Sequence, residues 1–235
     1  MIDNEILRPL VPLVMCFIAY FVMHSLLASL WLKKWVHRKW PKLMHGYRLT
    51  YNFLAVLLLI PLLWFMQQNP GALIWQWPGL LAWVMKGLTV AAVLGFIWSL
   101  KSYDNMVFLG ITQWRNRHTG SSDPESLHIS TLHRFVRHPW YFFILVILWT
   151  QDLHLTQLIT YSLISAYLII GSRIEERKLI VHYGEAYREY RQQVPGLIPL
   201  PWRWLKKEEA NHLTKLAARH KQMIDIKQVE NEVSK

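Results

Sequence analysis

Long apolar runs separated by short polar segments dominate the chain. Three of them, at residues 9–32, 46–66 and 78–100, each reach the ~20 residues that a helix needs to cross a bilayer. A fourth run, at 139–150, is too short to cross alone unless the residues before it extend it, and a fifth follows at 153–172. The pattern predicts an all-α integral membrane protein with about five transmembrane helices.

Basic residues alternate between the segments that connect these runs. Lys and Arg gather in cytoplasmic loops of membrane proteins, so their distribution predicts the orientation. The segment after the second run is uncharged, and the residues beyond Arg173 are rich in Lys and Arg. We therefore expect a multi-pass protein of a bacterial inner membrane, with its N-terminus outside and its C-terminus in the cytoplasm. The other basic positions follow the first run (Lys33, Lys34, Arg38, Lys39, Lys42) and the third (Lys101, Arg115, Arg117, Arg134, Arg137).

The two ends of the chain differ in character. The stretch "MIDNEILRP" lacks the basic region of a cleavable signal, so we interpret the first apolar run as a permanent span. Residues 208–235 are strongly charged, with Leu213, Leu216, Met223 and Ile226 near helical spacing. The expected organisation is a membrane domain at residues 1–207 followed by a charged amphipathic or disordered tail at 208–235.

The net charge of +11 alone would suggest a nucleic-acid partner. The basic residues are divided among segments between apolar runs, however, so contact with anionic lipid headgroups explains them better. Membrane lipids are therefore expected partners and nucleic acid is not. Cys16 is the only cysteine, which excludes an internal disulfide and a cysteine-based metal site, and we expect no metal.

The stretch "RFVRHPWYFFILVILW" places a basic and aromatic cluster directly before the fourth apolar run. Pro139 suits the first turn of a helix, where its missing N–H costs nothing. Arg137 and His138 would then stand beside free backbone donors, which favour an anionic group, with Tyr141 one turn further on. The alternative interpretation is an anchor at the membrane interface, with Arg137 and Tyr141 at headgroup level.

A second polar cluster, "GSRIEERKLIVHYG", follows the fifth run and contains Arg173, Glu175 and Glu176. Carboxylates at the end of a span are costly unless they are paired or face a polar cavity. Neighbouring arginines could neutralise them, so a purely structural role is an open alternative. Gly184 is expected to end this helix in a left-handed cap.

The segment "EAYREYRQQV" predicts a short amphipathic helix with Tyr187, Tyr190 and Val194 on one face. Its aromatic side chains, opposite an acidic helix end, could hold a cationic, adenine-bearing ligand by stacking and cation–π attraction. They could equally pack on the membrane surface. Pro195 and later prolines then turn the chain. His24, inside the first run, is a further candidate because ionisable residues within a membrane are costly.

In this order, "RHPWY", "EERKL" and "YGEAYREYRQQVPGLIP" resemble the isoprenylcysteine carboxyl methyltransferase superfamily of membrane methyltransferases. Its members share a pattern like R-H-P-x-Y-x-G, then E-E-x-x-L, then F/Y-G-x-x-Y-x-x-Y-x-x-x-V-P. The full match covers residues 134–199. Upstream, "HSLLAS", "YR" at 47–48 and "YDNMVFLGITQ" are similar to the branch that contains methanethiol S-methyltransferases and NnrU-type proteins.

The resemblance implies an enzyme that binds S-adenosylmethionine between cytoplasmic helix ends and a C-terminal segment folded back on the membrane face. Its methyl acceptor would be a small or lipophilic thiol or a prenyl-cysteine-like carboxylate. As candidate catalytic residues, Arg173 at the membrane boundary could stabilise an anionic acceptor, and Glu176 could position either the acceptor or the cofactor. The motif positions implied to bind the cofactor are Arg137, His138, Pro139, Tyr141, Glu175, Tyr187, Tyr190 and Pro195, with Leu179 and Gly184 also on the motifs.

The sequence departs from the pattern at Phe143, where the family has glycine. A bulky ring replaces a residue that would let the backbone approach a ligand closely. This departure favours one alternative, a non-catalytic NnrU-like membrane protein. A second alternative is an NADPH-dependent reductase, since sterol reductases resemble the C-terminal part of this fold, although five spans are few for such an enzyme.

Overall fold

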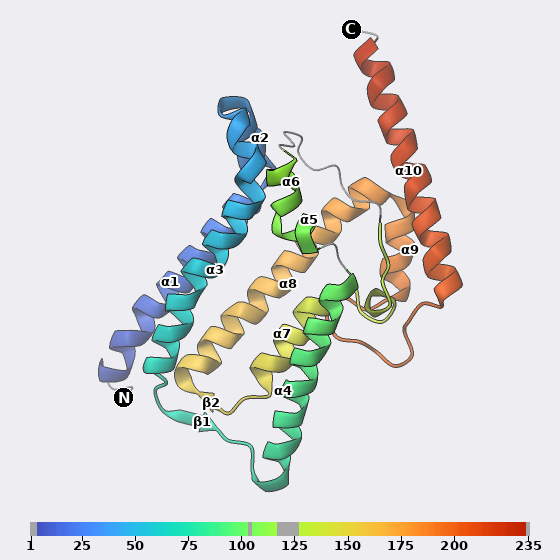
Figure 1. Ribbon diagram of the computed structural model, residues 1–235. Helices are drawn as coiled ribbons and strands as arrows, with labels where there is room; N and C mark the ends of the chain where they lie inside the picture. Colours follow the sequence, from blue (N-terminus) through green and yellow to red (C-terminus); the bar gives the residue numbers. More distant parts are fainter. Residues whose placement is uncertain (1–3, 103–104, 117–126, 234–235) are drawn as a thin grey trace. The chain divides into compact units, whose positions relative to one another are not determined.

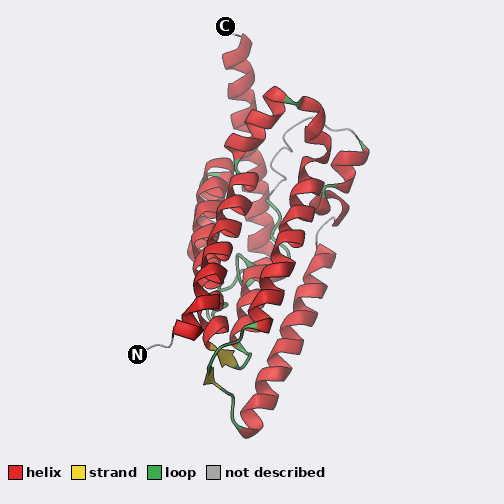
Figure 2. Ribbon diagram, turned by 90° about the vertical axis from the view of Figure 1, so that its left-hand side faces the viewer, coloured by secondary structure: helices red, strands yellow, loops and turns green. Residues whose placement is uncertain are grey.

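The computed structural model describes residues 4–102, 105–116 and 127–233, most of which are helical (Figure 1). The two short strands, yellow in Figure 2, are β1 (Leu73–Trp75) and β2 (Leu153–His154), which pair antiparallel. The α-helices are α1 (Asn4–Ala28), α2 (Leu30–Lys39), α3 (Met44–Gln68), α4 (Gly79–Ser99), α5 (Asn105–Leu109), α6 (Ile111–Arg115), α7 (Pro139–Trp149), α8 (Leu155–Tyr183), α9 (Glu185–Gln193) and α10 (Lys207–Val233). Short 3₁₀ turns lie at Pro41–Leu43, Leu100–Ser102 and Leu132–Arg134.

Four segments among the described residues are long and apolar enough to cross a membrane: Leu10–Ala28, Pro41–Gln68, Gly79–Ser99 and Leu155–Tyr183. Helix α7, the shorter apolar helix, begins at Pro139, so the residues before it do not lengthen it. The prediction of an all-α membrane protein is confirmed, with four full-length spans and one helix too short to cross alone. The predicted cytoplasmic position of the C-terminus stays a prediction.

The chain divides into two compact units, and α7 and α8 each contribute residues to both. Unit 1 comprises Met1–Ser121 and Ile147–Tyr167, and unit 2 comprises Ser122–Val146 and Leu168–Lys235. All three motifs of the resemblance, at residues 137–141, 175–179 and 183–199, therefore lie in unit 2. The upstream motifs lie in unit 1.

Unit 1 is held together by apolar contacts between membrane helices and by a few buried hydroxyl groups. Phe17 and Leu13 of α1 pack with Met66 of α3 and Tyr161 of α8. His24 of the "HSLLAS" motif accepts or donates a hydrogen bond at 2.7 Å between its Nε2 and the hydroxyl of Tyr51. An ionisable side chain in a span is thus paired with a polar partner, as the cost of burying it requires.

The motif "YDNMVFLGITQ" is described from residue 105 onward, so Tyr103 and Asp104 lie outside the described residues, as does Arg117. Its glycine, Gly110, has a φ of 89° and links α5 to α6. A Cβ added there would lie 2.7 Å from the backbone nitrogen of Leu49 and 2.8 Å from the Cβ of Arg48. Glycine is needed because it permits both the positive φ and the close approach to α3.

Unit 2 has a core of its own, formed where α9 and α10 lie side by side (Figure 1). Tyr187, Tyr190 and Val194 are buried together with Leu213 and Ala217 of α10. The predicted single face of the α9 segment is therefore confirmed, and it packs against α10. Leu127 and Leu205 complete this buried set.

The structure extends two sequence-based expectations. Helix α8 continues to Tyr183, so Glu175 and Glu176 belong to the same helix as the fifth apolar run. The proposed boundary after residue 207 stays a prediction, but the region beyond it is helical, and its Leu213 is 1% exposed while Met223 is 56% exposed. The described first half of α10 thus contributes to the core of unit 2.

Gly184 separates α8 from α9, as expected, but not through a left-handed helical cap. Its φ of 56° is positive, whereas its ψ of −130° lies far from the left-handed helical region. Such a conformation is nearly exclusive to glycine. A Cβ at this position would lie 2.6 Å from the ring of His220, so that ring would have to move to admit any other residue.

Candidate functional site

The candidate site of unit 2 is organised around the side chain of Glu176. Its position on α8 directs the carboxylate into the protein, where the residue is only 7% exposed. Glu175, the preceding residue, is rotated by about 100° around the helix, and its side chain is half exposed. One carboxylate is therefore buried and structural in character, and its neighbour is accessible.

Arg137 is the main partner of Glu176. Its Nε donates to Oε1 of Glu176 at 2.8 Å, and its Nη2 lies 2.7 Å from the same oxygen. Its Nη1 donates to the backbone carbonyls of Arg191, at 2.9 Å, and of Val194. Most of the five guanidinium N–H groups are therefore used inside the protein. Arg137 therefore connects α8 with the end of α9, and its guanidinium group has little capacity left to bind a ligand.

The backbone around Pro139 is also occupied. The N–H of Arg137 donates to the carbonyl of Pro195 at 2.9 Å, and that of His138 donates to Gly196 at 3.0 Å. The N–H groups of the two residues before α7 are thus bound by the segment that follows α9. Gly196 permits this approach, since a Cβ there would lie 3.2 Å from Nη2 of Arg137.

His138 lies between the two carboxylates. Its Nε2 is 3.2 Å from Oε1 of Glu176, and its Nδ1 is 3.6 Å from Oε2 of Glu175. The ring is stacked on that of Tyr141, with centroids 5.2 Å apart and planes 9° apart. The residue is 8% exposed, so its orientation is fixed by these contacts.

The two tyrosines of α9 have a supporting position. Tyr190 donates a hydrogen bond from its hydroxyl to the carbonyl of His133 at 2.6 Å. Burial raises the pKa of the Tyr187 hydroxyl, and the negative charge of Glu176 raises it further. Both rings belong to the core against α10, so they stabilise the floor of the site and present little surface to a ligand.

The structure thus brings together six of the residues singled out from the sequence: Arg137, His138, Tyr141, Glu175, Glu176 and Pro195. Pro139 is buried and begins α7 as expected. Arg173 is exposed on α8. Tyr187 lies close enough to Glu176 for the carboxylate charge to raise the pKa of its hydroxyl. Tyr190 instead contacts the segment before α7, through its hydrogen bond to the carbonyl of His133.

Two residues of this site were not singled out from the sequence. Arg191 lies with its Nε 3.7 Å from Oε2 of Glu176, and its side chain is about half exposed. His133 bonds through Nδ1 to the hydroxyl of Ser130 at 2.7 Å. Burial, and then the charges of His128 and His138, lower its pKa to about 4. The position of Arg191, directly after Tyr190 in the third motif, was the available signal.

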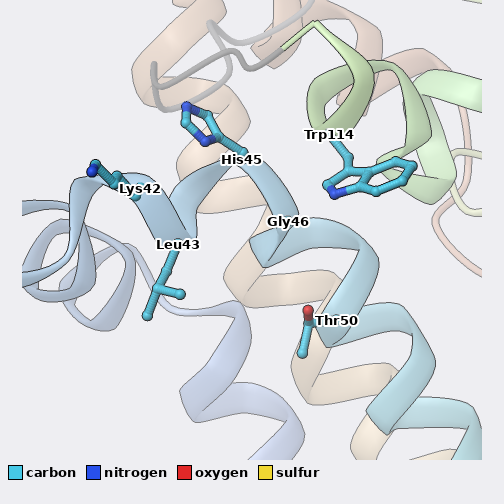
Figure 3. A pocket seen from close by; sticks show the side chains of 6 residues that line it. All are labelled: Lys42, Leu43, His45, Gly46, Thr50 and Trp114. Carbon is cyan, nitrogen blue, oxygen red and sulfur yellow. The ribbon is translucent and has the colours of Figure 1, made fainter.

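Unit 1 contains a separate hollow of about 320 Å³, shown in Figure 3. Trp114 of α6 reaches toward Gly46, where an added Cβ would lie 3.7 Å from its ring (Figure 3). None of its residues belongs to the three motifs, so this hollow gives no support to the motif-based site. Its lining is formed by Lys42, Leu43, His45, Gly46, Thr50 and Trp114.

Curated proteins of one name are similar to most of the chain. Methanethiol S-methyltransferase 2 of Bradyrhizobium diazoefficiens is 28% identical over 184 residues, which cover 77% of this chain and 69% of that protein. The methanethiol S-methyltransferase of Crocosphaera subtropica is 28% identical, with 77% and 71% covered. The Mycobacterium tuberculosis protein of that name is 29% identical, with 78% and 75% covered.

No family model matches the chain, and no solved structure is significantly similar to it. The relatives agree with the branch indicated by the upstream motifs, and the all-α membrane architecture agrees with it as well. The chain is therefore a relative of the methanethiol S-methyltransferases, consistent with the isoprenylcysteine carboxyl methyltransferase-like branch that its motifs predicted.

Proposed function

We propose that this membrane protein transfers a methyl group from S-adenosylmethionine to a small thiol. The observation that carries the proposal is the meeting of all three motifs at Glu176, in a chain whose curated relatives are named methanethiol S-methyltransferases. Methanethiol is the first acceptor to test. The reaction would take place on the cytoplasmic side, which follows from the orientation expected from the basic segments.

The available side chains fit the chemistry of this cofactor. A sulfonium cation is stabilised by a carboxylate or by the face of an aromatic ring, and Glu175 and Tyr141 supply one of each beside His138. A cofactor carboxylate requires a cationic donor. Arg191 is half exposed and suits that role, whereas Arg137 is engaged by Glu176 and by backbone carbonyls.

When bound, the cofactor supplies an electrophilic methyl group for an in-line displacement. The protein then contributes chiefly alignment, because a correctly oriented pair of reactants avoids much of the entropic cost of meeting. Arg137 and Glu176 fix α7, α8 and the segment after α9 in one arrangement. Arg173, exposed on α8, is proposed to attract the anionic form of the acceptor, with Glu176 acting by positioning.

Calorimetry with the purified full-length protein in detergent micelles tests the proposal directly. S-adenosylmethionine should bind, and a headspace assay should detect the methyl thioether formed from methanethiol. Glu175→Gln should weaken cofactor binding by about 1–3 kcal/mol, as expected for a lost interaction with a charged group. His212→Gln, an exposed change on α10, is the matched control and should bind like the wild type.

The rival interpretations predict different results in the same experiment. Cofactor binding without thioether formation would favour the NnrU-like, non-catalytic alternative. Binding of NADPH in place of S-adenosylmethionine would favour a reductase. Absence of S-adenosylmethionine binding would overturn the proposed function.

A further inference from the structure

The hollow of about 320 Å³ in unit 1 is lined by side chains that donate hydrogen bonds. Lys42 carries an ammonium group, His45 an imidazole and Thr50 a hydroxyl, and each of these groups has a proton to donate. Leu43 and Gly46 add apolar surface and backbone, and none of the six lining residues is acidic. This set of groups suits an anion better than a cation.

Trp114 adds a further donor at the side of the hollow. The atom of its ring nearest to an added Cβ on Gly46 is Cδ1, at 3.7 Å. Because Cδ1 is bonded to the indole nitrogen, the edge of the ring that carries the N–H borders the hollow (Figure 3). An indole nitrogen donates a hydrogen bond and accepts none. The same Cβ would lie 4.0 Å from Oγ1 of Thr50, so glycine leaves the space between these two side chains open.

The sequence around the hollow is basic and contains no acidic residue. Asp and Glu are absent between Glu5 and Asp104, a stretch that includes all of α2 and α3. Five basic residues precede α3 in this stretch, namely Lys33, Lys34, Arg38, Lys39 and Lys42. Basic clusters beside a membrane span attract anionic lipid headgroups. An anion from outside the chain therefore complements the charge of this segment.

The hollow also lies at a suitable depth for a lipid headgroup. The span Pro41–Gln68 has 28 residues, so it is about 42 Å long at about 1.5 Å per residue. The hydrocarbon core of a bilayer is about 30 Å thick and the whole bilayer about 40–45 Å. A span centred on that core places its first turn, with Lys42 and His45, at headgroup level. Thr50, about 12 Å further along the helix than Lys42, then lies in the outer part of the hydrocarbon.

Large apolar side chains are exposed around the same turn. Leu43 and Trp114 are each more than half exposed, and Trp40 is nearly half exposed. The ring of Trp40 contacts that of Trp35 edge-on, with centroids 5.2 Å apart. Tryptophan is typical of the boundary between lipid and water, where its ring meets glycerol and acyl carbons while its N–H meets polar groups. A small soluble anion would leave these side chains uncovered, whereas a phospholipid covers them.

We infer that the hollow binds the phosphate of an anionic phospholipid of the phosphatidylglycerol type. Lys42 and His45 contact the phosphate, and Trp114 lies beside the glycerol and the first acyl carbons. A zwitterionic lipid offers the same phosphate but carries an ammonium group that Lys42 repels. The inference does not depend on the proposed methyltransferase function, because every lining residue belongs to unit 1 and none to the three motifs of unit 2.

Native mass spectrometry of the delipidated full-length protein in a neutral detergent tests this inference, because it resolves each bound lipid. The first phosphatidylglycerol should bind at least about fivefold more tightly than the first phosphatidylethanolamine. Lys42→Gln should remove most of that preference, since about fivefold is the effect of one basic residue beside a headgroup. Lys34→Gln is the matched control: it removes the same charge from an exposed position on α2 and should retain the preference.

Filling the hollow provides a second test that leaves every charge in place. Gly46→Leu puts a side chain between Trp114 and Thr50, so the preference for phosphatidylglycerol should be lost. Gly46→Ala is its control, because a Cβ there makes only ordinary contacts, at 3.7 and 4.0 Å, and the preference should remain. Melting temperatures in the same detergent show whether each variant is folded. Lys42→Gln keeps the inference testable if Gly46→Leu does not fold.

Three results would overturn the inference. Equal affinity of the wild type for the two lipids would mean that the hollow does not recognise the anionic headgroup. Equal loss of preference in Lys42→Gln and Lys34→Gln would assign the effect to the basic segment as a whole. Glycerol 1-phosphate, added as a soluble competitor at the same concentration, should not displace phosphatidylglycerol; if it does, the hollow is a site for a soluble phosphate instead.

Discussion

Arg137 and Glu176 meet through a single carboxylate oxygen. Both Nε and Nη2 of the arginine lie within 2.8 Å of Oε1, and each side chain is about a tenth exposed. Removing one member of such a buried pair leaves an uncompensated charge, which is far more costly than losing an exposed ion pair. The pair connects the start of α7 with α8, and through the carbonyls of Arg191 and Val194 it also holds the end of α9.

Glu176→Gln should therefore lower the free energy of unfolding by about 3–5 kcal/mol. Arg137→Lys should also be strongly destabilising, because one ammonium group cannot reach the carboxylate and both carbonyls. Thermal unfolding in detergent, followed by intrinsic fluorescence, measures both losses. Glu185→Gln is the control, since the Glu185–Arg188 pair is more than half exposed and such pairs contribute about 0–1 kcal/mol. Equal losses in Glu176→Gln and Glu185→Gln would contradict this view of the site.

Gly184→Ala should destabilise unit 2 by about 1–3 kcal/mol, since the new methyl group would meet the ring of His220 and the backbone has a conformation nearly exclusive to glycine. The double variant with His220→Ala should recover part of the loss, because it removes the contact but not the backbone strain. Gly171→Ala is the control within α8, where an added Cβ meets nothing within 4 Å. Recovery of full stability in the double variant would show that backbone strain contributes nothing.

The fold follows from the apolar runs, but the ends of the helices do not. The hydropathy pattern fades at residue 172, whereas α8 continues to Tyr183. Arg, Glu, Lys and Leu are all good helix formers, so "RIEERKL" extends a helix without extending the apolar pattern. The role of α10 was missed for a similar reason. Leu213 and Ala217 are two apolar residues in a mostly charged segment, and they are buried because they pack against the aromatic face of α9.

The order of the motifs predicted which segments would form the site, but not how Arg137 would be used. The expectation of free donors before Pro139 followed from the rules for isolated helices. In the structure the chain turns back after Val194, and the carbonyls of Pro195 and Gly196 accept hydrogen bonds from the N–H groups of Arg137 and His138, which fill the space before the helix. This return depends on the path of a segment without regular structure, which no residue pattern specifies.

The stability of the protein should fall in mild acid because of His133. Its pKa of about 4 in the folded state is below the ordinary value of 6.5, so the unfolded chain binds the proton more readily. The contribution of the neutral ring is complete above about pH 6.5 and is lost as the pH falls toward 4, by up to about 3 kcal/mol. Unfolding curves at pH 7.5 and pH 5 should differ less in His133→Asn, which cannot titrate, than in the wild type. An undiminished difference in that variant, matching His212→Asn, would exclude His133 as the cause.

The membrane orientation can be measured with single cysteines introduced into a Cys16→Ala background. Gln76→Cys lies in the uncharged segment after α3, and His37→Cys lies in the basic helix α2; both positions are exposed. With the N-terminus outside, an impermeant maleimide should label position 76 in intact cells, and position 37 only after permeabilisation. The reverse pattern would place α2 outside and would remove the basis for a cytosolic cofactor site.

Phe143, the departure from the family pattern, provides the last prediction. Tyr141 stacks on His138, and a residue two positions further along a helix is rotated by about 200°, so Phe143 is directed away from that contact. Its ring instead lies 5.5 Å from that of Phe142. Phe143→Gly should therefore lower the melting temperature, through lost aromatic contacts and a helix cost of about 1 kcal/mol for glycine, while cofactor affinity is preserved.

Phe143→Ala separates the two contributions, since alanine removes the ring but keeps a good helix former, and it should lie between the wild type and Phe143→Gly in melting temperature. Cofactor affinity, measured by calorimetry on all three proteins, decides what Phe143 means for function. An affinity that rises tenfold or more on removing the ring would show that Phe143 obstructs the cofactor pocket, as a vestigial site requires. A lower melting temperature with no cofactor binding in any of the three would favour the membrane-anchor interpretation of "RHPWYFF". Preserved affinity would show instead that the family glycine can be replaced at this position without loss of the site, because the ring is directed away from the contact between Tyr141 and His138.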